Sequence, residues 1–466
     1  MKRHRILTIL ALSCLGLLLT ACGMGGGGGS DPATATPESA TTLTLAEASF
    51  EDAGGTAAYL NRTVTTEGIV TVEPGVLANN KLKVFIQDGG AGIMVYHENS
   101  GAVNAADFAV GNRVRVTGTV RQADPSSGNN AAVGTPLIDI SGGSWSVVSA
   151  GNDLPAPRVV TLNELAANGN DYDGTLVNAI EVHKVAGSWP VVGDQSKSVT
   201  VSDGTANLTL RFQKNTITAE MAARLAAIGN GAFHLVAIAT QDDTNGDGDL
   251  LDGFQLWVRG VDDIIEPANL VRQAAVGDTV TAEGVVTVAS GILFDNKFEV
   301  FIQDSTGGLM LLNTAGGLSV AEGDLVRCTG TLANTDASGQ PLTGTLRIDF
   351  TNSGTIEVLS HGNPLPAPQV VTLAQYLAAP ENYEGELIRI NGASKTAGNW
   401  PAVGVKGTIT ISDDGGATTA KLQVQKGANT VDLTGTANPF DVVGIAVHNG
   451  ASWEVWIRSP EDINPL

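Results

Sequence analysis

Residues 64–72 read VTTEGIVTV, and this stretch decides the fold because a near copy returns at residues 280–288 as VTAEGVVTV. At the same offset, residues 84–88 (VFIQD) recur unchanged at residues 300–304. Self-similarity of this kind is the signature of a structural unit used twice. The chain therefore contains an internal duplication.

The two halves run roughly from 44 to 266 and from 267 to 466. Each half divides again at the sequence LPAP, found at residues 154–157 and 365–368. A unit of about 100 residues supports one simple core. We therefore expect four domains, covering residues 44–153, 154–266, 267–364 and 365–466.

Apolar and polar residues alternate within these stretches, as in strands with one buried face. Gly68 interrupts the first stretch, and Gly118 interrupts RVRVTGTV at residues 113–120. A glycine inside a strand often marks the bend or bulge that a small closed barrel requires. The pattern predicts short, curved strands.

One helix is expected at residues 218–228, with Thr218 as N-cap and Gly229 at the C-terminus. Strands before and after a helix are the order of a five-stranded OB barrel. The predicted fold is all-β: four small OB-like β-barrels in two duplicated pairs, with short helices, after a signal peptide and flexible tether.

The motifs resemble the OB-fold domains attached to bacterial extracellular, sugar-nonspecific nucleases. The resemblance is good for the first and third units and weaker for the others. Those nucleases carry a separate catalytic domain, whereas here the four barrels occupy the chain from the tether to Leu466. The matching segments, first copy and then second, are residues 67–71, 85–88 and 111–119, and residues 283–287, 301–304 and 323–331.

Catalytic motifs are missing from the sequence. There is no Gly-x-Ser-x-Gly, His-Glu-x-x-His or Walker pattern, and the six His are scattered without metal-ligand spacing. We therefore expect a protein that is not an enzyme.

The first 21 residues read as a targeting signal. Three basic residues precede an apolar stretch at residues 6–19, which is short for a bilayer span. The following LTAC at residues 19–22 resembles the lipobox of bacterial lipoproteins. This resemblance implies cleavage before Cys22, lipidation of Cys22 and a membrane anchor. The alternative is a cleaved signal peptide in which Cys22 is incidental.

Gly23 follows the cysteine, which by the same resemblance favours the outer membrane, with the protein facing the periplasm or the cell surface. Residues 22–43 are rich in Gly, Pro and Thr and cannot bury a core. Such a segment is a flexible tether between the lipid and the barrels.

The charge balance is strongly acidic, with 26 Lys and Arg against 48 Asp and Glu, a net charge of −22. Removing the signal leaves 23 basic residues and a net charge of −25. This disfavours general polyanion binding, because phosphate affinity comes mainly from Lys and Arg. The third cysteine, Cys328, replaces the apolar Val116 of the first half and should be buried.

An acidic loop in the second unit carries alternating oxygen ligands and a turning glycine, as calcium loops do. It resembles the core of EF-hand-like loops, but Phe254 stands where a bidentate Glu is expected. Motif offsets suggest that this region is a 12-residue insertion relative to the last unit. We expect a structural Ca²⁺ ion here, the alternative being a solvated hairpin loop. The candidate ligands are Asp243, Asn245, Asp247, Asp249 and Asp252.

The strand after that loop carries Trp257 and Arg259, repeated as Trp456 and Arg458. Alternation predicts that both pairs point out of their barrels. Trp beside Arg suits stacking of a base or sugar ring. The alternative, which the need for domain interfaces favours, is packing against a neighbouring barrel. Arg211 and Lys214 would extend a binding face.

Two hypotheses about function remain. The first is a membrane-anchored, non-catalytic binding module for an extracellular nucleic acid, glycan or protein partner. The second is a structural or adhesive cell-surface spacer, or an accessory subunit of an extracellular nuclease. The fold alone does not decide between them.

Overall fold

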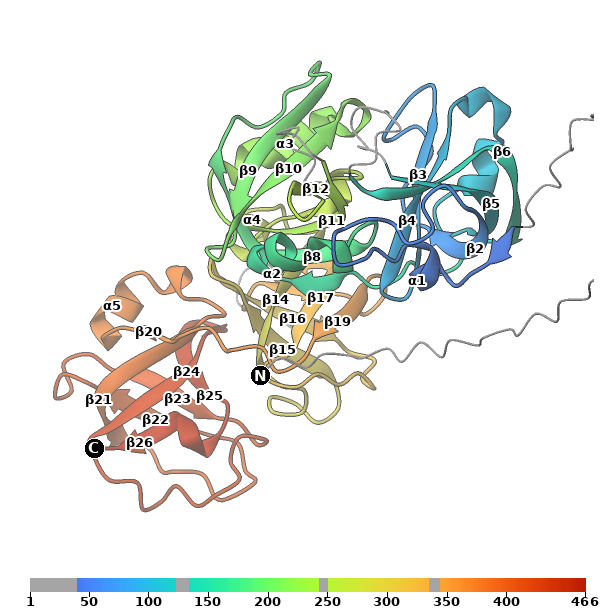
Figure 1. The fold of residues 1–466 in the computed structure, drawn as a ribbon. Coiled ribbons are helices and arrows are strands. Elements are labelled where there is room, and N and C mark those ends of the chain that lie inside the picture. The colour runs from blue at the N-terminus through green and yellow to red at the C-terminus, as the bar shows by residue number, and fades with distance from the viewer. Residues whose placement is uncertain (1–39, 123–133, 243–249, 335–343) are drawn as a thin grey trace, which may run out of the picture. The chain divides into compact units, whose positions relative to one another are not determined.

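Four β-sheets follow one another along the chain in the computed structural model (Figure 1). The structure describes residues 40–122, 134–242, 250–334 and 344–466. Within these ranges, no helix has the length and apolar character needed to cross a bilayer.

The first barrel shows the topology that all four share. Its strands are hydrogen-bonded in the order β2-β3-β4-β6-β5, and β5 returns to pair with β2. Only β4 and β6 are parallel within this ring. This is the strand order of a closed five-stranded OB barrel. The elements are β1 (Thr41–Thr42), α1 (Leu45–Ala48), β2 (Thr63–Val70), β3 (Leu82–Asp88), β4 (Ala91–His97), η1 (Ser100–Ala102), η2 (Ala105–Phe108), β5 (Arg113–Gln122) and β6 (Pro136–Ser149).

The second barrel closes in the order β8-β9-β10-β12-β11, with β11 pairing β8. Its elements are β7 (Arg158–Val160), α2 (Leu162–Asn168), η3 (Gly169–Asp171), β8 (Leu176–Ala186), β9 (Ser196–Ser202), β10 (Asn207–Gln213), η4 (Lys214–Thr216), α3 (Ala219–Ile228), β11 (Phe233–Gln241), β12 (Phe254–Trp257), η5 (Val261–Asp263) and β13 (Ile264–Ile265).

The third and fourth barrels repeat these two rings. The third contains α4 (Ala268–Val271), β14 (Thr279–Val288), β15 (Phe298–Gln303), β16 (Gly308–Asn313), β17 (Leu325–Ala333), β18 (Arg347–Asp349) and β19 (Thr355–Ser360). The fourth contains β20 (Gln369–Val370), α5 (Leu373–Ala378), η6 (Pro380–Asn382), β21 (Leu387–Ala397), β22 (Gly407–Ser412), β23 (Ala420–Val424), β24 (Phe440–Asn449), β25 (Ser452–Ile457), η7 (Pro460–Asp462) and β26 (Ile463–Pro465).

The alternating pattern of the sequence becomes the inside and outside of each barrel. Along β2, every second residue from Val64 to Val70 is buried. Glu67 lies outside and pairs across the ladder with Arg115, as Glu283 pairs with Arg327 in the duplicate. The predicted all-β architecture of four OB-like barrels is confirmed.

Gly68 is required by close packing at the end of the first barrel. A Cβ there would lie 3.0 Å from Ile86 Cβ and 3.1 Å from a methyl carbon of Leu45 in α1.

The predicted helix is α3: Thr218 caps it and Met221, Leu225 and Ile228 form its buried face. It lies between β10 and β11, the third and fourth strands of this barrel in chain order.

The loop between β11 and β12 is a shorter insertion than the sequence suggested. Ile238 pairs with Trp257, and Ile445 pairs with Trp456. The offset between halves is therefore 207 in β11 and 199 in β12, a difference of eight residues. The other four of the 12 residues enter earlier, because α3 has no helical counterpart between β23 and β24.

Candidate functional site

An apolar cluster joins the first barrel to the second, and its duplicate joins the third to the fourth. Both clusters involve the second and third strands of the odd-numbered barrel, the face through which OB folds commonly bind ligands. Much of that face is therefore covered. The main members are Phe85, Met94, Leu176, Ile238 and Trp257 in the first cluster, and Phe301, Met310, Leu387, Ile445 and Trp456 in the second.

Trp257 and Trp456 point out of their own barrels, as predicted, but they do not form a stacking platform. Trp257 is 1% exposed and Trp456 is 6% exposed. Each ring packs into the cluster between its barrel and the preceding one. For Trp257 the proposed contact with a ligand is corrected to a role in joining the barrels, because the ring is buried. Trp456 joins barrels too, but it also lines the pocket described below.

Arg259 and Arg458 are bound in the same junctions. Arg259 forms a forked contact with Asp263, with Nη2 2.5 Å from Oδ1, and donates from Nη1 to the carbonyl oxygen of Thr71 in the first barrel (3.2 Å). Arg458 repeats both contacts, with Asp462 and with a carbonyl of the third barrel. These guanidinium groups hold barrels together. Arg259 also lines a pocket of about 550 Å³, together with Arg224 and Arg327.

Arg211 and Lys214 lie on β10 and just after it. Arg211 stands between Ser198 and Trp257 in the sheet, and Lys214 is exposed at the start of η4. Next to Lys214, Asn215 donates to the carbonyl of Gly75 in the first barrel (2.5 Å). Lys214 therefore borders an inter-barrel contact.

The fourth barrel leaves part of the ligand-binding face of the third barrel open. A pocket of about 460 Å³ lies there, between β15, β16 and the β24–β25 hairpin. Phe294 is half-buried at its rim. The Lys297 ammonium lies 3.8 Å and the Lys406 ammonium 5.9 Å from the centre of the Phe294 ring. We call this the aromatic pocket. Its walls include Phe294, Lys297, Met310, Arg347, His448 and Trp456.

The aromatic pocket combines an apolar ring with cationic groups and with two carboxylates, those of Asp349 and of Glu299, which pairs with Lys297. His448 also stacks on Trp453, with ring centres 4.3 Å apart and planes 8° apart. A base or sugar ring can stack on such a surface while an ammonium group approaches a phosphate. In the first half, Ala78 replaces Phe294 and, with Lys81, lines a smaller pocket of about 240 Å³. The Lys81 ammonium lies 5.5 Å from the centre of the Tyr96 ring.

The sequence motifs missed the aromatic pocket because Phe294 lies in a loop between the repeated segments. The available signal was a difference between the halves: residues 292–297 read ILFDNK, whereas residues 76–81 read VLANNK. A large ring appears in one copy at a loop position where the other copy has alanine.

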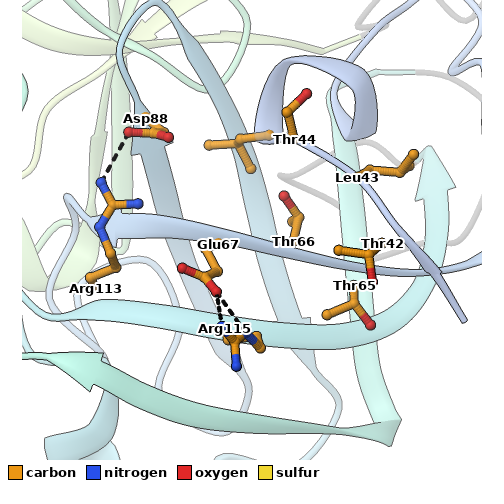
Figure 2. A pocket seen from close by; sticks show the side chains of 10 residues that line it. Thr42, Leu43, Thr44, Thr65, Thr66, Glu67, Asp88, Arg113 and Arg115 are labelled. Carbon is orange, nitrogen blue, oxygen red and sulfur yellow. Dashed lines mark hydrogen bonds and ion pairs between the residues drawn. The ribbon is translucent and has the colours of Figure 1, made fainter.

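A second pocket, of about 410 Å³, lies on the first barrel beside α1 and β2 (Figure 2). Arg115 Nε donates to Glu67 (2.6 Å) and Arg113 Nη2 donates to Asp88 (3.0 Å). These four side chains define what we call the receiving face. They neutralise one another and remain substantially exposed.

The third barrel has the same face, but the second barrel covers it. His234 of β11 is 2% exposed, with its two ring nitrogens 3.7 Å from Glu283 and 3.6 Å from Asp304. Asn178 of β8 donates from Nδ2 to Glu283 (3.1 Å). The contacts form a buried polar junction.

Opposite charges set the pKa values in this junction. Burial alone would lower the pKa of His234, but its hydrogen bond to Asp304 and the charges of Glu283 and Asp304 outweigh this and raise it. For Asp304, burial acts to raise the pKa, but His234 and hydrogen bonds from Ala268 and Thr306 lower it. The charged forms of both partners are therefore favoured.

Four of the five expected calcium ligands, Asp243, Asn245, Asp247 and Asp249, lie outside the described residues. Asp252 is half-buried just after them. Among residues the structure describes, no group of three or more His, Cys, Asp or Glu is arranged to hold a metal.

Two acidic groups nevertheless lie in the same region. Asn170 in η3 donates to the carbonyl of Leu250, at the end of the loop. Nearby, burial raises the pKa of Asp173 to about 7, and burial together with the charge of Asp173 raises the pKa of Glu51 to about 10. A cation at this end of the loop would favour their charged forms.

Of the cysteines, Cys22 lies outside the described residues. Cys328 is fully buried in the core of the third barrel, as predicted. Burial raises the pKa of its thiol to about 12, so it remains protonated at neutral pH and packs as a small apolar group.

Comparison with known proteins gives one partial relative. No family model matches the chain. Endonuclease YhcR of Bacillus subtilis (strain 168) is 27% identical over 159 residues, which are 34% of this chain and 12% of that protein. The chain thus spans a small part of the relative's length.

Among solved structures, the p204 HINb domain is 13% identical, with a TM-score of 0.17 over 38% of this chain and 96% of that domain. A replication protein A heterotrimer bound to ssDNA is 10% identical, with a TM-score of 0.20 over 66% of this chain and 96% of that chain. Scores this low carry no functional argument.

Proposed function

We propose that the protein is a non-catalytic, lipid-anchored module of the bacterial cell envelope that binds single-stranded nucleic acid. The observation that carries the proposal is the aromatic pocket, in which Phe294 is flanked by Lys297 and Lys406. It lies beside the second and third strands of an OB barrel, where oligonucleotides bind to this fold. The partial relative, an endonuclease by name, supports the same ligand class.

The net charge limits the strength of such binding. With 48 acidic residues against 26 basic ones, the chain repels a polyanion at long range. Stacking on Phe294 and a few local cations must supply most of the affinity. We therefore expect a short binding site and a shallow salt dependence.

A test is fluorescence anisotropy of a labelled single-stranded oligonucleotide with the purified protein. Phe294→Ala should weaken binding about fivefold or more, as expected for loss of one stacked base. Phe50→Ala is the matched control, because Phe50 is 60% exposed and lies on the first barrel. An unchanged affinity in Phe294→Ala, or no binding by the wild type, would contradict the proposal.

The anchor is a separate part of the proposal. It rests on LTAC at residues 19–22 and on the Gly-rich and Thr-rich segment that follows. Several acyl chains on Cys22 would hold the protein stably in a membrane. Metabolic labelling with a radioactive fatty acid should mark the wild type and not Cys22→Ser. Label retained in Cys22→Ser would exclude lipidation at that position.

We also propose that a structural Ca²⁺ ion occupies the loop from Asp243 to Asp252. The alternating oxygen ligands of the sequence support this. Calcium should raise the melting temperature of the metal-free protein, and Asp247→Asn should reduce that gain. If calorimetric titration with calcium shows no heat of binding and calcium does not raise the melting temperature, the site is excluded.

A second candidate function is that of a spacer. One observation favours it: the usual ligand-binding faces of the first and third barrels are largely buried against their neighbours. If neither oligonucleotides nor glycans bind, the spacer becomes the better description.

A further inference from the structure

The receiving face of the first barrel is exposed, whereas its duplicate is buried. The side chains of Glu67 and Asp88 are 30% and 52% exposed. Their counterparts Glu283 and Asp304 are 0% and 2% exposed, because the second barrel covers them. The same surface is therefore a docking site in one copy, whereas in the other no part of the chain that the structure describes covers it.

The fourth barrel carries the matching open surface at the other end of the chain. Ile390 pairs with Val442 in the fourth barrel as Ala179 pairs with Leu235 in the second. This register places Arg389 at the position of Asn178, and Asp441 at the position of His234. The Arg389 side chain is 41% exposed and pairs with Asp441, whose side chain is only 12% exposed. We call Arg389 and Asp441 the donating face.

The backbone supports this equivalence. The Gly392 N–H donates to Asp441 Oδ1 (2.9 Å), and the Glu181 nitrogen lies 3.4 Å from His234 Nδ1. Gly392 and Glu181 both have positive φ, 65° and 54°. The two even-numbered barrels thus present the same local geometry, one covered and one open.

We propose that the receiving face of the first barrel binds the donating face of a second copy of this chain, in the way the third barrel binds the second. The contact between the second and third barrels within one chain, the internal junction, is the model for this contact between two copies. The fourth barrel would approach the first barrel of the next copy through β21 and β24.

The charge differences between the two copies compensate one another. Asp441 brings a carboxylate where the internal junction has His234. On the opposite side, Arg113 brings a guanidinium where the internal junction has Leu325. Arg389 would face Glu67, as Asn178 faces Glu283. In the internal junction His234 lies between Glu283 and Asp304, so Asp441 would also approach the carboxylates of Glu67 and Asp88. The guanidinium groups of Arg389, Arg113 and Arg115 would balance these three carboxylates in sum, and not pair by pair.

Exposed apolar residues border both faces. In the internal junction β7 lies against β19. Val370, in the strand equivalent to β7, is 64% exposed, and Val147 and Val148, in the segment equivalent to β19, are 41% and 45% exposed. In the internal junction Val358, the counterpart of Val147, is still 36% exposed, so docking would bury only part of this apolar surface. A contact between different faces leaves one of each open, so copies add head to tail.

The test is sedimentation velocity of the full chain in detergent over a series of concentrations. The wild type should self-associate. Arg389→Glu alone and Glu67→Arg alone should each weaken association about tenfold or more, because each places like charges opposite one another. An equimolar mixture should associate again, since one variant keeps its receiving face and the other keeps its donating face.

Glu98→Arg and Glu381→Arg are matched controls, because both glutamates are exposed and lie outside the two faces. Each should associate like the wild type. A monomeric wild type at all concentrations, unaffected association in the two face variants, or a mixture that stays monomeric would overturn the proposal. Circular dichroism and melting temperature separate loss of association from loss of folding.

Discussion

At the scale of single residues, burial decides what the conspicuous side chains do. Trp257 and Arg259 are residue types that often bind ligands, yet both are used to join barrels. Phe294 was unremarkable in the sequence, and it keeps part of its ring open beside two ammonium groups. Residue type alone therefore did not identify the site.

Trp257→Ala should destabilise the first half by about 3–5 kcal/mol, the cost of removing a large buried aromatic ring. Trp257 is 1% exposed in the cluster between two barrels. Denaturant unfolding followed by circular dichroism measures the change. Trp257→Phe, which keeps a ring in the cluster, should lose less.

A stacking role makes a different prediction for the same variant. If Trp257 bound a base or sugar, Trp257→Ala would lose ligand affinity while stability stayed near the wild-type value. That result would contradict the buried position described here.

Alternation in the sequence correctly predicted which way several residues point. Cys328 is inside its barrel and Trp257 is outside its own. Alternation could not show what covers an outward residue, because that depends on contacts between segments far apart in the chain. The burial of Trp257 therefore had to come from the structure.

At the scale of elements, glycine contacts bring neighbouring barrels together. A Cβ on Gly92, in β4, would lie 2.1 Å from the carbonyl oxygen of Gly174, just before β8. Gly308 and Gly385 repeat this approach with the same 2.1 Å. Beside it, the Leu176 N–H donates to Gln87 Oε1 (2.9 Å). The junction depends on backbone in direct contact.

Gly92→Ala should force the first two barrels apart, because backbone cannot move aside as a flexible side chain does. We expect faster limited proteolysis in the linker at residues 154–157 and a lower melting temperature. Gly90→Ala is the control: a Cβ at Gly90 has nothing within 4 Å. Equal proteolysis of the two variants would argue against a tight junction.

Elements with strong local signals were predicted well. The N-cap, apolar face and terminal glycine of α3 are all encoded within a dozen residues. The length of the insertion before β12 was overestimated, because the offset between two motifs sums the length differences of all the loops that separate them. Only the pairing of β11 with β12 assigns eight of those residues to this loop.

At the scale of the whole molecule, the duplication predicted four barrels but not how they meet. Motif spacing carries no information about the covered receiving face of the third barrel. Its contacts involve Asn178, His234 and Glu283, which lie outside one another's sequence neighbourhood. Such a junction is specified by surfaces and not by local pattern.

The junction of the second and third barrels should weaken in alkaline solution. The pKa of His234 is raised, so its contribution is complete below about pH 6.5 and is lost as pH rises through the folded-state value. The pKa of Asp304 is lowered, so its contribution is complete above about pH 3.9 and is lost as pH falls through its folded-state value.

Hydrogen exchange of the Ser305 amide, which donates to Glu181 across this junction, can measure the effect. After correction for intrinsic exchange, protection should be lower at pH 9 than at pH 6 in the wild type. In His234→Gln the difference should largely disappear. Equal protection of the wild type at both pH values would contradict this assignment.

The cluster around Phe85, Met94 and Trp257 also has a consequence for synthesis. The first barrel contributes Phe85 and Met94, and its strands are complete by Ser149, whereas Trp257 is added more than a hundred residues later. Until the second barrel folds, the first barrel presents an apolar face without its partner residues, which begin with Leu176. The growing chain therefore passes through a stage at which this face is open to holdase chaperones or to mispairing with another nascent chain.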